Sequence, residues 1–301
     1  MLTLLPPAHG KRQSHDEERS HSQRKNGKQS RRKVPLAALL VERGIFTSLD
    51  EARRWIMAGK VLVNDSCFDK PGMAVPGDAV VRVRGRSRYA SRAGHKLEAA
   101  LAHFAVDVAR QVALDCGAST GGFTDCLLQH GASLVYAVDA GYGQLVGYLR
   151  ADPRVRNLER TNLGDLAASM LNPPPTLITL DLSYLSLTQA LPLATNLLAA
   201  EGQVLALIKP LFEVESAQAR RSGHIDDPML LIKALQRVLE AGTASGLAVQ
   251  GLAKLALKPQ HGVHEFFASF VRCPGAITRQ YDEQALLAIV EGQGIGRTEV
   301  E

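Results

Sequence analysis

Charged side chains lie at the ends of several apolar runs in this chain, and each run is typical of a buried strand. Four of these positions carry residues that could do chemistry: Asp115, Asp139, Asp181 and Lys209. The carboxyl ends of parallel strands meet at one edge of an open sheet, and ligands bind at that edge. A single charged residue at a strand end is usually just a surface residue. Four charged residues at the ends of four strands predict a shared site.

A glycine-rich stretch follows the first of these runs and predicts a strand end, a tight turn and a helix start. Glycine lets the backbone approach a ligand closely because it has no Cβ. Asp139, at the tip of the next strand, can accept hydrogen bonds from ribose hydroxyls. We therefore expect a nucleoside ligand, with contacts from these residues: Asp115, Gly117, Ala118, Ser119, Gly121, Gly122, Phe123 and Asp139.

The class of ligand follows from patterns that the turn lacks. Ser119 interrupts the Gly-x-Gly-x-x-Gly pattern of dinucleotide sites, and the Gly-Lys-Ser/Thr of a triphosphate site is absent from the turn. An Asp at the strand end with small residues behind it suits S-adenosylmethionine (SAM), a nucleoside without phosphates. The alternative is a tight turn that binds no ligand.

Composition limits the class of protein. A chain of 301 residues that is 46% hydrophobic predicts a globular protein with two domains. No apolar run approaches the roughly 20 residues of a membrane span, and the first residues lack a secretory signal. The four cysteines show no metal-ligand spacing, so we expect reduced thiols and no metal. Together with the missing membrane span and secretory signal, this predicts a cytoplasmic protein with no membrane partner. The net charge of +5 favours a polyanionic partner.

Basic residues are concentrated at two places outside the predicted domains. Residues 1–32 are rich in Lys and Arg and poor in apolar residues, so we expect a disordered basic arm. Residues 85–92 form a predicted basic linker, in which Arg88 and Arg92 are candidates for RNA contacts. The alternatives are a solvated tail and a plain tether.

Residues 33–84 predict two short helices followed by a small hairpin, with Ser48 and Glu51 as a capping box. This order resembles the S4-like RNA-binding domain, notably at residues 40–44 (LVERG) and 58–64 (AGKVLVN). In that family basic residues of the helix pair contact structured RNA, mainly at its phosphates. The resemblance implies RNA contacts from Arg43, Arg53, Arg54 and Lys60.

Residues 93–275 alternate apolar strand patterns with helical ones, which predicts an α/β domain built on a Rossmann-like sheet. Lys96 lies near the start of the first helix, beside the positive end of the helix dipole. A cation is unfavourable at that end of a helix, so its presence there indicates a candidate functional site. Residues 276–301 are expected to form a tail with one helix, residues 282–291.

SAM combined with an RNA-binding domain predicts methyl transfer to RNA, and the acceptor decides which residues are needed. Methylation of a pyrimidine carbon requires a cysteine nucleophile, and no cysteine lies between Asp139 and Lys209. Amine methylation typically uses Asp or Asn before Pro-Pro-Tyr, whereas Asp181 precedes Leu-Ser-Tyr. A ribose 2′-hydroxyl must lose its proton, which lysines and carboxylates can arrange.

Four residues match, in order and context, the Lys-Asp-Lys-Glu set of the FtsJ-like ribose 2′-O-methyltransferases: Lys96, Asp181, Lys209 and Glu265. With the N-terminal domain, the chain resembles the TlyA family of ribosomal RNA methyltransferases, which also carry the name haemolysin. The resemblance is specific in residues 91–98, 138–145, 181–187 and 208–213.

The resemblance implies a SAM cofactor whose adenine lies near Asn162 and whose methyl donor is positioned by Asp181. It also implies ribosomal RNA or ribosomal subunits as the partner. The acceptor is then a cytidine ribose in 23S and 16S RNA. The alternatives are an RNA-binding assembly factor without catalysis and a membrane-active haemolysin.

Overall fold

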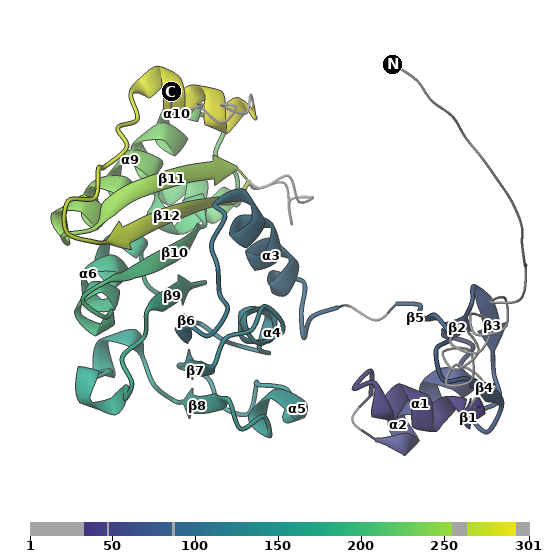
Figure 1. Cartoon of the computed structure of the whole chain (residues 1–301). Coiled ribbons are helices and arrows are strands. Elements are labelled where there is room, and N and C mark those ends of the chain that lie inside the picture. Colours follow the sequence, from purple (N-terminus) through teal and green to yellow (C-terminus); the bar gives the residue numbers. More distant parts are fainter. Residues whose placement is uncertain (1–32, 47, 86–87, 255–263, 293–301) are drawn as a thin grey trace, which may run out of the picture. The chain divides into compact units, whose positions relative to one another are not determined.

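The computed structural model describes residues 33–46, 48–85, 88–254 and 264–292. The chain divides into two compact units, with the boundary after Arg86 (Figure 1). The predicted arm, residues 1–32, and the last part of the predicted tail, residues 293–301, lie outside the described residues.

The first unit packs two helices against short strands. Helix α1 (Leu36–Glu42) is followed by α2 (Leu49–Met57), whose Ser48 cap accepts a hydrogen bond from the Glu51 backbone N–H at 3.2 Å, as the capping box predicts. Strand β1 (Lys33–Pro35) pairs with β4 (Ala74–Pro76). Three further strands form an antiparallel sheet: β2 (Val61–Val63), β3 (Ser66–Phe68) and β5 (Val81–Val83). The predicted α+β organisation is confirmed.

The second unit is built on a seven-stranded sheet with the order β11-β12-β10-β9-β6-β7-β8. Its strands have the following bounds: β6 (Val112–Cys116), β7 (Leu134–Asp139), β8 (Val155–Glu159), β9 (Leu177–Leu180), β10 (Gly202–Ile208), β11 (Ala248–Lys254) and β12 (Phe266–Arg272). The strands from β6 to β10 are parallel, whereas β12 is antiparallel to β10 and to β11. The expected Rossmann-like sheet is confirmed, and β12 adds an antiparallel strand inside it.

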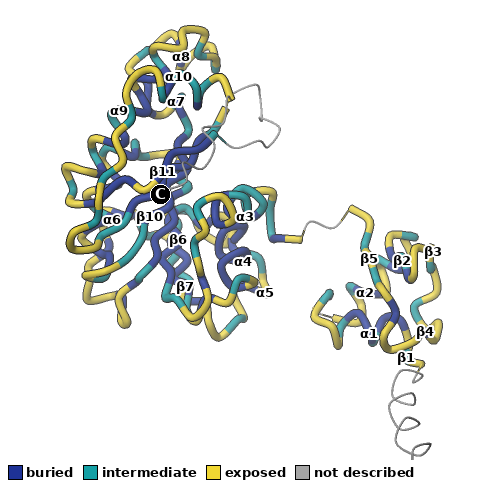
Figure 2. The backbone as a smooth tube through the Cα atoms, turned by 45° about the horizontal axis from the view of Figure 1, so that its top comes forward, coloured by how far each residue is buried: buried dark blue, intermediate teal, exposed yellow. Residues whose placement is uncertain are grey.

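Helices cover both faces of this sheet. They have the following bounds: α3 (Ala93–His103), α4 (Gly122–Gln129), α5 (Gly147–Arg150), α6 (Leu187–Leu197), α7 (Pro210–Glu213), α8 (Ala217–Ser222), α9 (Pro228–Ala244) and α10 (Glu283–Glu291), with 3₁₀ turns η1 (Leu163–Asp165) and η2 (Ala168–Met170). Helices α3 and α4 pack on one face and α6 and α9 on the other, so the central strands are buried on both faces (Figure 2).

Residues 88–92, assigned to the linker from the sequence, pack against the second unit. Tyr89 is buried and so close to Gly94 that a Cβ on that glycine would overlap its ring. The Ala90 backbone N–H donates to Asp125 Oδ2 at 2.8 Å. This segment therefore fixes the start of α3, the helix that carries Lys96.

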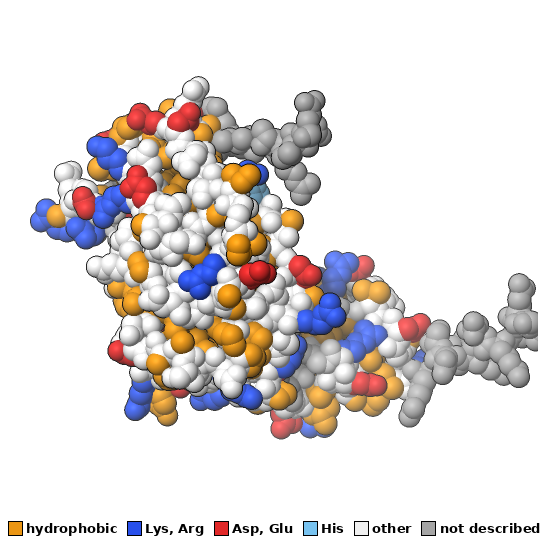
Figure 3. Space-filling view, turned by 60° about the vertical axis from the view of Figure 1, so that its left-hand side comes forward, with side chains coloured by type: hydrophobic (Ala, Val, Ile, Leu, Met, Phe, Trp, Pro, Cys, Tyr) orange, Lys and Arg blue, Asp and Glu red, His pale blue; other side chains and the backbone are white. Residues whose placement is uncertain are grey.

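Charged and uncharged side chains are interspersed on the surface of the second unit. On the face shown in Figure 3, Lys and Arg side chains occur in small groups separated by uncharged surface. Several of the basic residues are paired with acids, as in Arg237–Glu215 and Arg154–Asp152. Among the described residues, none of the helices combines the length and the apolar character that crossing a membrane requires.

Candidate active site

The glycine turn between β6 and α4 lies against the strands on both sides of it. The backbone N–H groups of Gly117 and Ala118 both donate to the Val138 carbonyl, at 2.9 and 3.0 Å. Gly117 has a φ of +87°, and a Cβ there would overlap the carbonyl oxygen of Asp181. Glycine is therefore required at position 117 by both its backbone angle and the close approach of the loop after β9.

Asp139 ties the end of β7 to this turn. Its Oδ2 accepts a hydrogen bond from the Ser119 backbone N–H at 2.8 Å, and its Oδ1 accepts one from Gly141 at 2.7 Å. Ser119 is exposed and has a φ of +48°, a conformation that this contact helps to hold. Asp139 is partly exposed, and a carboxylate has lone pairs beyond those two bonds. Its predicted ribose contact is compatible with this geometry and stays a prediction.

Protein atoms lie beside several residues at the end of the turn that were predicted to contact a ligand. A Cβ on Gly121 would overlap Leu149, and one on Gly122 would overlap Ser91. Phe123 is 2% exposed, and its ring stacks on Phe267 with 6.1 Å between centroids. These contacts show how the start of α4 packs, and the predicted ligand contacts of these residues stay predictions. Ala118 is also buried.

The side chain of Asp115 is completely buried, and the place of this residue in the cofactor site stays a prediction. Thr124 Oγ1 donates to one carboxylate oxygen at 2.7 Å, and Thr179 Oγ1 donates to the other at 3.1 Å. In this arrangement a ligand cannot touch the side chain. Its hydrogen bonds connect the end of β6 to α4 and β9. Burial raises the pKa of Asp115 to about 7, with a further contribution from the charge of Asp181, while the threonine hydrogen bonds oppose the shift.

Replacing Asp115 with asparagine is expected to change how stability depends on pH. The folded-state pKa of about 7 is above the unfolded value, so the folded protein binds the extra proton between roughly pH 4 and 7. The stabilisation is complete below that window and is lost as pH rises through it. Between pH 5 and 8 we expect the unfolding free energy of the parent to fall by roughly 3 kcal/mol relative to Asp115→Asn.

Urea unfolding of both proteins at the two pH values measures this difference. Comparing the two proteins cancels the titration of all other groups, since asparagine has the same shape and does not titrate. Parallel pH profiles for the two proteins would contradict a raised pKa at Asp115.

Lys209 and Asp181 form an ion pair where β9 and β10 end. Lys209 Nζ lies 2.6 Å from Asp181 Oδ1 and donates a hydrogen bond to Ser183 Oγ at 2.8 Å. The two side chains of the pair are 19% and 15% exposed. They are shielded enough for the attraction to hold them in place, and they remain accessible to a bound substrate.

Lys96 and Glu265 form a second ion pair beside the first. Lys96, on α3, has its Nζ 2.5 Å from Glu265 Oε2, and Glu265 directly precedes β12. Strand β12 runs antiparallel to β10 with Phe266 opposite Ile208, so Glu265 and Lys209 are in adjacent register. All four predicted catalytic residues therefore meet at the carboxyl edge of the sheet, at the end where Gly117 contacts Asp181.

All the residues predicted to contact RNA are exposed, and several of them also contact other residues of the protein. Arg43 donates to the carbonyls of Ala79 and Gly77 at 2.7 and 2.6 Å, so its guanidinium holds a turn of the first unit. Arg53 pairs with Asp50 at 3.1 Å, and Arg88 pairs with Glu98. The other candidates are Arg54, Lys60 and Arg92. The cofactor candidate Asn162 is exposed as well and donates to Asp165 at 3.1 Å.

Sequence reasoning missed several residues that support the site. Thr124 and Thr179 hold Asp115, Ser183 accepts from Lys209, and Glu213 is buried behind the pair. Ser183 and Glu213 lie within the phrases that carry the family resemblance, which was the available signal. Thr179 has no sequence signal, because its partner Asp115 is 64 residues away along the chain.

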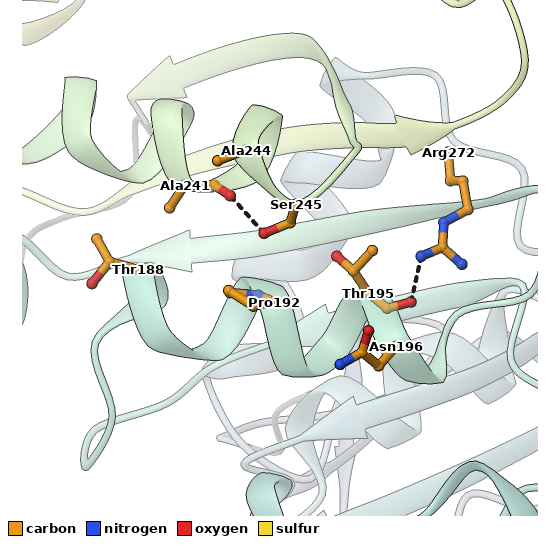
Figure 4. A pocket seen from close by; sticks show the side chains of 8 residues that line it. All are labelled: Thr188, Pro192, Thr195, Asn196, Ala241, Ala244, Ser245 and Arg272. Carbon is orange, nitrogen blue, oxygen red and sulfur yellow. Dashed lines mark hydrogen bonds between the residues drawn. The ribbon is translucent and has the colours of Figure 1, made fainter.

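A cavity of about 350 Å³ lies between α6 and α9 (Figure 4). The side chains that line it are Thr188, Pro192, Thr195, Asn196, Ala241, Ala244, Ser245 and Arg272. Arg272 donates to the Thr195 and Leu198 carbonyls at 2.6 and 3.0 Å, so its guanidinium caps the C-terminal end of α6. Arg272 pairs with Gly202 at the start of β10, which places this cavity at the opposite edge of the sheet from the catalytic residues.

The electrostatics of the catalytic edge suit a cofactor that carries hydroxyls and positive charge. Residues 117–124 contain no Lys or Arg that could neutralise phosphates. Asp139 instead presents a carboxylate beside the glycine turn, and the carboxylate of Asp181 is paired with Lys209. In the part of the chain that the structure describes, no cluster of His, Cys, Asp and Glu residues is arranged to hold a metal ion.

Comparisons with known proteins agree with both units. The sequence matches the FtsJ-like methyltransferase family over residues 89–272 and the S4 domain over residues 34–81. It is 38% identical to the 16S/23S rRNA (cytidine-2′-O)-methyltransferase TlyA of Mycobacterium tuberculosis, over 78% of this chain and 89% of the relative. It is 36% identical to Hemolysin A of Brachyspira hyodysenteriae, over 76% of this chain and 95% of the relative.

A solved structure extends these comparisons to the fold. The protein, from Streptococcus thermophilus and assigned as a hemolysin, shares 35% sequence identity and a TM-score of 0.64 with this chain. The match covers 86% of this chain and 95% of that protein. The chain therefore belongs to the TlyA family, with an S4 domain followed by an FtsJ-like methyltransferase domain.

Proposed function

We propose that this protein transfers a methyl group from SAM to the 2′-hydroxyl of a cytidine ribose in ribosomal RNA. The observation that carries the proposal is the meeting of two Lys–carboxylate pairs, Lys209–Asp181 and Lys96–Glu265, beside a glycine turn. Its relatives supply the substrate class, because the name of the Mycobacterium tuberculosis protein specifies cytidine-2′-O methylation of 16S and 23S rRNA.

The cofactor would be held by residues at the ends of β6, β7 and β9. Asp139 offers carboxylate oxygens to the ribose hydroxyls, Ser119 lies exposed in the turn, and Asp181 offers negative charge to the sulfonium. Bound SAM supplies an activated methyl group on a good leaving group. The protein's share of the catalysis is then alignment of the acceptor and removal of its proton.

The two ion pairs divide the remaining tasks. Lys209 Nζ is fixed by Asp181 and Ser183. It accepts the proton of the 2′-hydroxyl after releasing its own ammonium proton to solvent, or, as the ammonium, it donates to the 2′-oxygen and stabilises the negative charge that develops there. Lys96 and Glu265 orient the ribose from the α3 side of the edge. A positioned acid–base group of this kind contributes about 10²–10⁴-fold to the rate. The S4 domain binds the RNA through its phosphates and shape, with Arg54 and Lys60 as exposed candidates.

The proposal is tested by incubating the purified protein with radiolabelled SAM and ribosomal subunits, and then mapping the methylated positions. A 2′-O-methyl group blocks alkaline cleavage at its own nucleotide, so the label should be found in alkali-resistant dinucleotides that begin with cytidine. Subunits from a strain that lacks the protein serve as acceptor, and those from its parent strain should accept little label. Label on a base, or no incorporation into either subunit, would contradict the proposal.

A further inference from the structure

Glu213 is buried behind the catalytic residues, at the end of the short helix that begins after Lys209. Its side chain is 5% exposed. Its Oε2 accepts a hydrogen bond from Ser186 Oγ at 2.6 Å, and its Oε1 accepts one from the Leu187 backbone N–H at 2.9 Å. Both donors lie at the start of α6, which follows the loop that carries Asp181.

The charge of Glu213 is balanced by this helix start. Among the described residues, no Lys or Arg lies within ion-pair distance of its carboxylate. The N-terminus of an 11-residue helix carries free backbone N–H groups and the positive end of the helix dipole. A buried carboxylate is stable only with such partners, so the start of α6 and the end of α7 hold each other in place.

These contacts join two segments that carry catalytic residues. The loop from β9 to α6 contains Asp181 and Ser183 near its start and ends at Ser186. Helix α7 follows Lys209 and ends at Glu213. Lys209 contacts the loop near its start, at Asp181 and Ser183, and Glu213 holds its end. The loop is therefore fixed at both ends against the same short helix.

We propose that Glu213 is a positioning residue that sets the separation between Lys209 and the acceptor by fixing the loop of Asp181. The inference rests on the proposed methyl transfer. Without Glu213, Ser186 and Leu187 lose their acceptor, and the loop is free to move away from Lys209. Misplacement of reacting groups by about 1 Å costs up to roughly 100-fold in rate.

The test measures single-turnover methyl transfer at saturating SAM and ribosomal subunits, together with the dissociation constants of both. Glu213→Ala is expected to lower the rate at saturating SAM about 10–100-fold. The dissociation constant of the ribosomal subunits should stay unchanged, whereas SAM binding should weaken because the loop that moves carries Asp181. Glu213→Gln is expected to restore the rate to within about threefold of the parent, because its amide can accept from Leu187 and donate to Ser186. Ser186→Ala should lower the rate less, because the Leu187 backbone N–H still donates to Glu213.

Asp282→Ala is the matched control, because Asp282 caps α10 through the Ala285 backbone N–H at 2.7 Å and α10 packs on α9 and β11. Full activity of Glu213→Ala would overturn the inference. So would equal losses in Glu213→Ala and Glu213→Gln, which would indicate a need for charge and not for position. A loss in Glu213→Ala that follows its unfolded fraction, with Ser186→Ala fully active, would overturn it as well. No transfer by the parent protein would refute the proposed function itself.

Discussion

Replacing Lys209 with methionine is expected to lower the rate of methyl transfer by about 10²–10⁴-fold, the range for loss of a positioned acid–base group. Methionine keeps much of the length of the side chain and removes the ammonium that contacts Asp181 and Ser183. The 2′-hydroxyl then has no amine or ammonium group to interact with at the end of β10. Single-turnover transfer to ribosomal subunits at saturating SAM measures the effect.

Two further lysine variants make this result specific. Lys209→Arg keeps a positive charge that can pair with Asp181, but a guanidinium does not release its proton in a protein. We expect it to remain at least roughly tenfold below the parent in rate if Lys209 exchanges a proton. Lys233→Met changes an exposed lysine of α9 in the same unit and should leave the rate unchanged. A fully active Lys209→Met protein would exclude Lys209 from the chemistry.

Replacing Gly117 with alanine is expected to damage both the stability and the cofactor site. The residue has a φ of +87°, and the added Cβ would overlap the Asp181 carbonyl oxygen, which is backbone and cannot rotate away. Strain in a left-handed conformation and overpacking cost about 1–3 kcal/mol each, so we expect a loss of roughly 2–6 kcal/mol in unfolding free energy. Because the turn and Asp181 move apart, SAM affinity should fall roughly tenfold or more.

Gly246→Ala separates the two causes of this loss. Gly246 also has a positive φ, +82°, but a Cβ there would meet no atom within 4 Å. This variant should therefore show only the backbone strain, about 1 kcal/mol, with unchanged SAM affinity. Urea unfolding and calorimetric titration with SAM compare the two proteins. Equal destabilisation in both variants would contradict the close approach of the turn to Asp181.

Local patterns in the sequence predicted much of the catalytic edge. Asp139 and Asp181 lie where their strands end, and the glycine turn lies between β6 and α4. Such features depend on a few neighbouring residues, since a strand end or a glycine with positive φ is decided by short-range sterics. The resemblance to a known family added Glu265, which no local pattern marks as a partner of Lys96.

Only the tertiary structure decided which way these side chains face and what they touch. Asp115 and Asp139 look alike in sequence, yet Asp115 is enclosed by Thr124 and Thr179 because β6 lies in the middle of the sheet. Glu265 reaches the site because β12 inserts antiparallel beside β10. Residues far apart in sequence meet through strand order and helix packing, and these depend on how the whole core fills space.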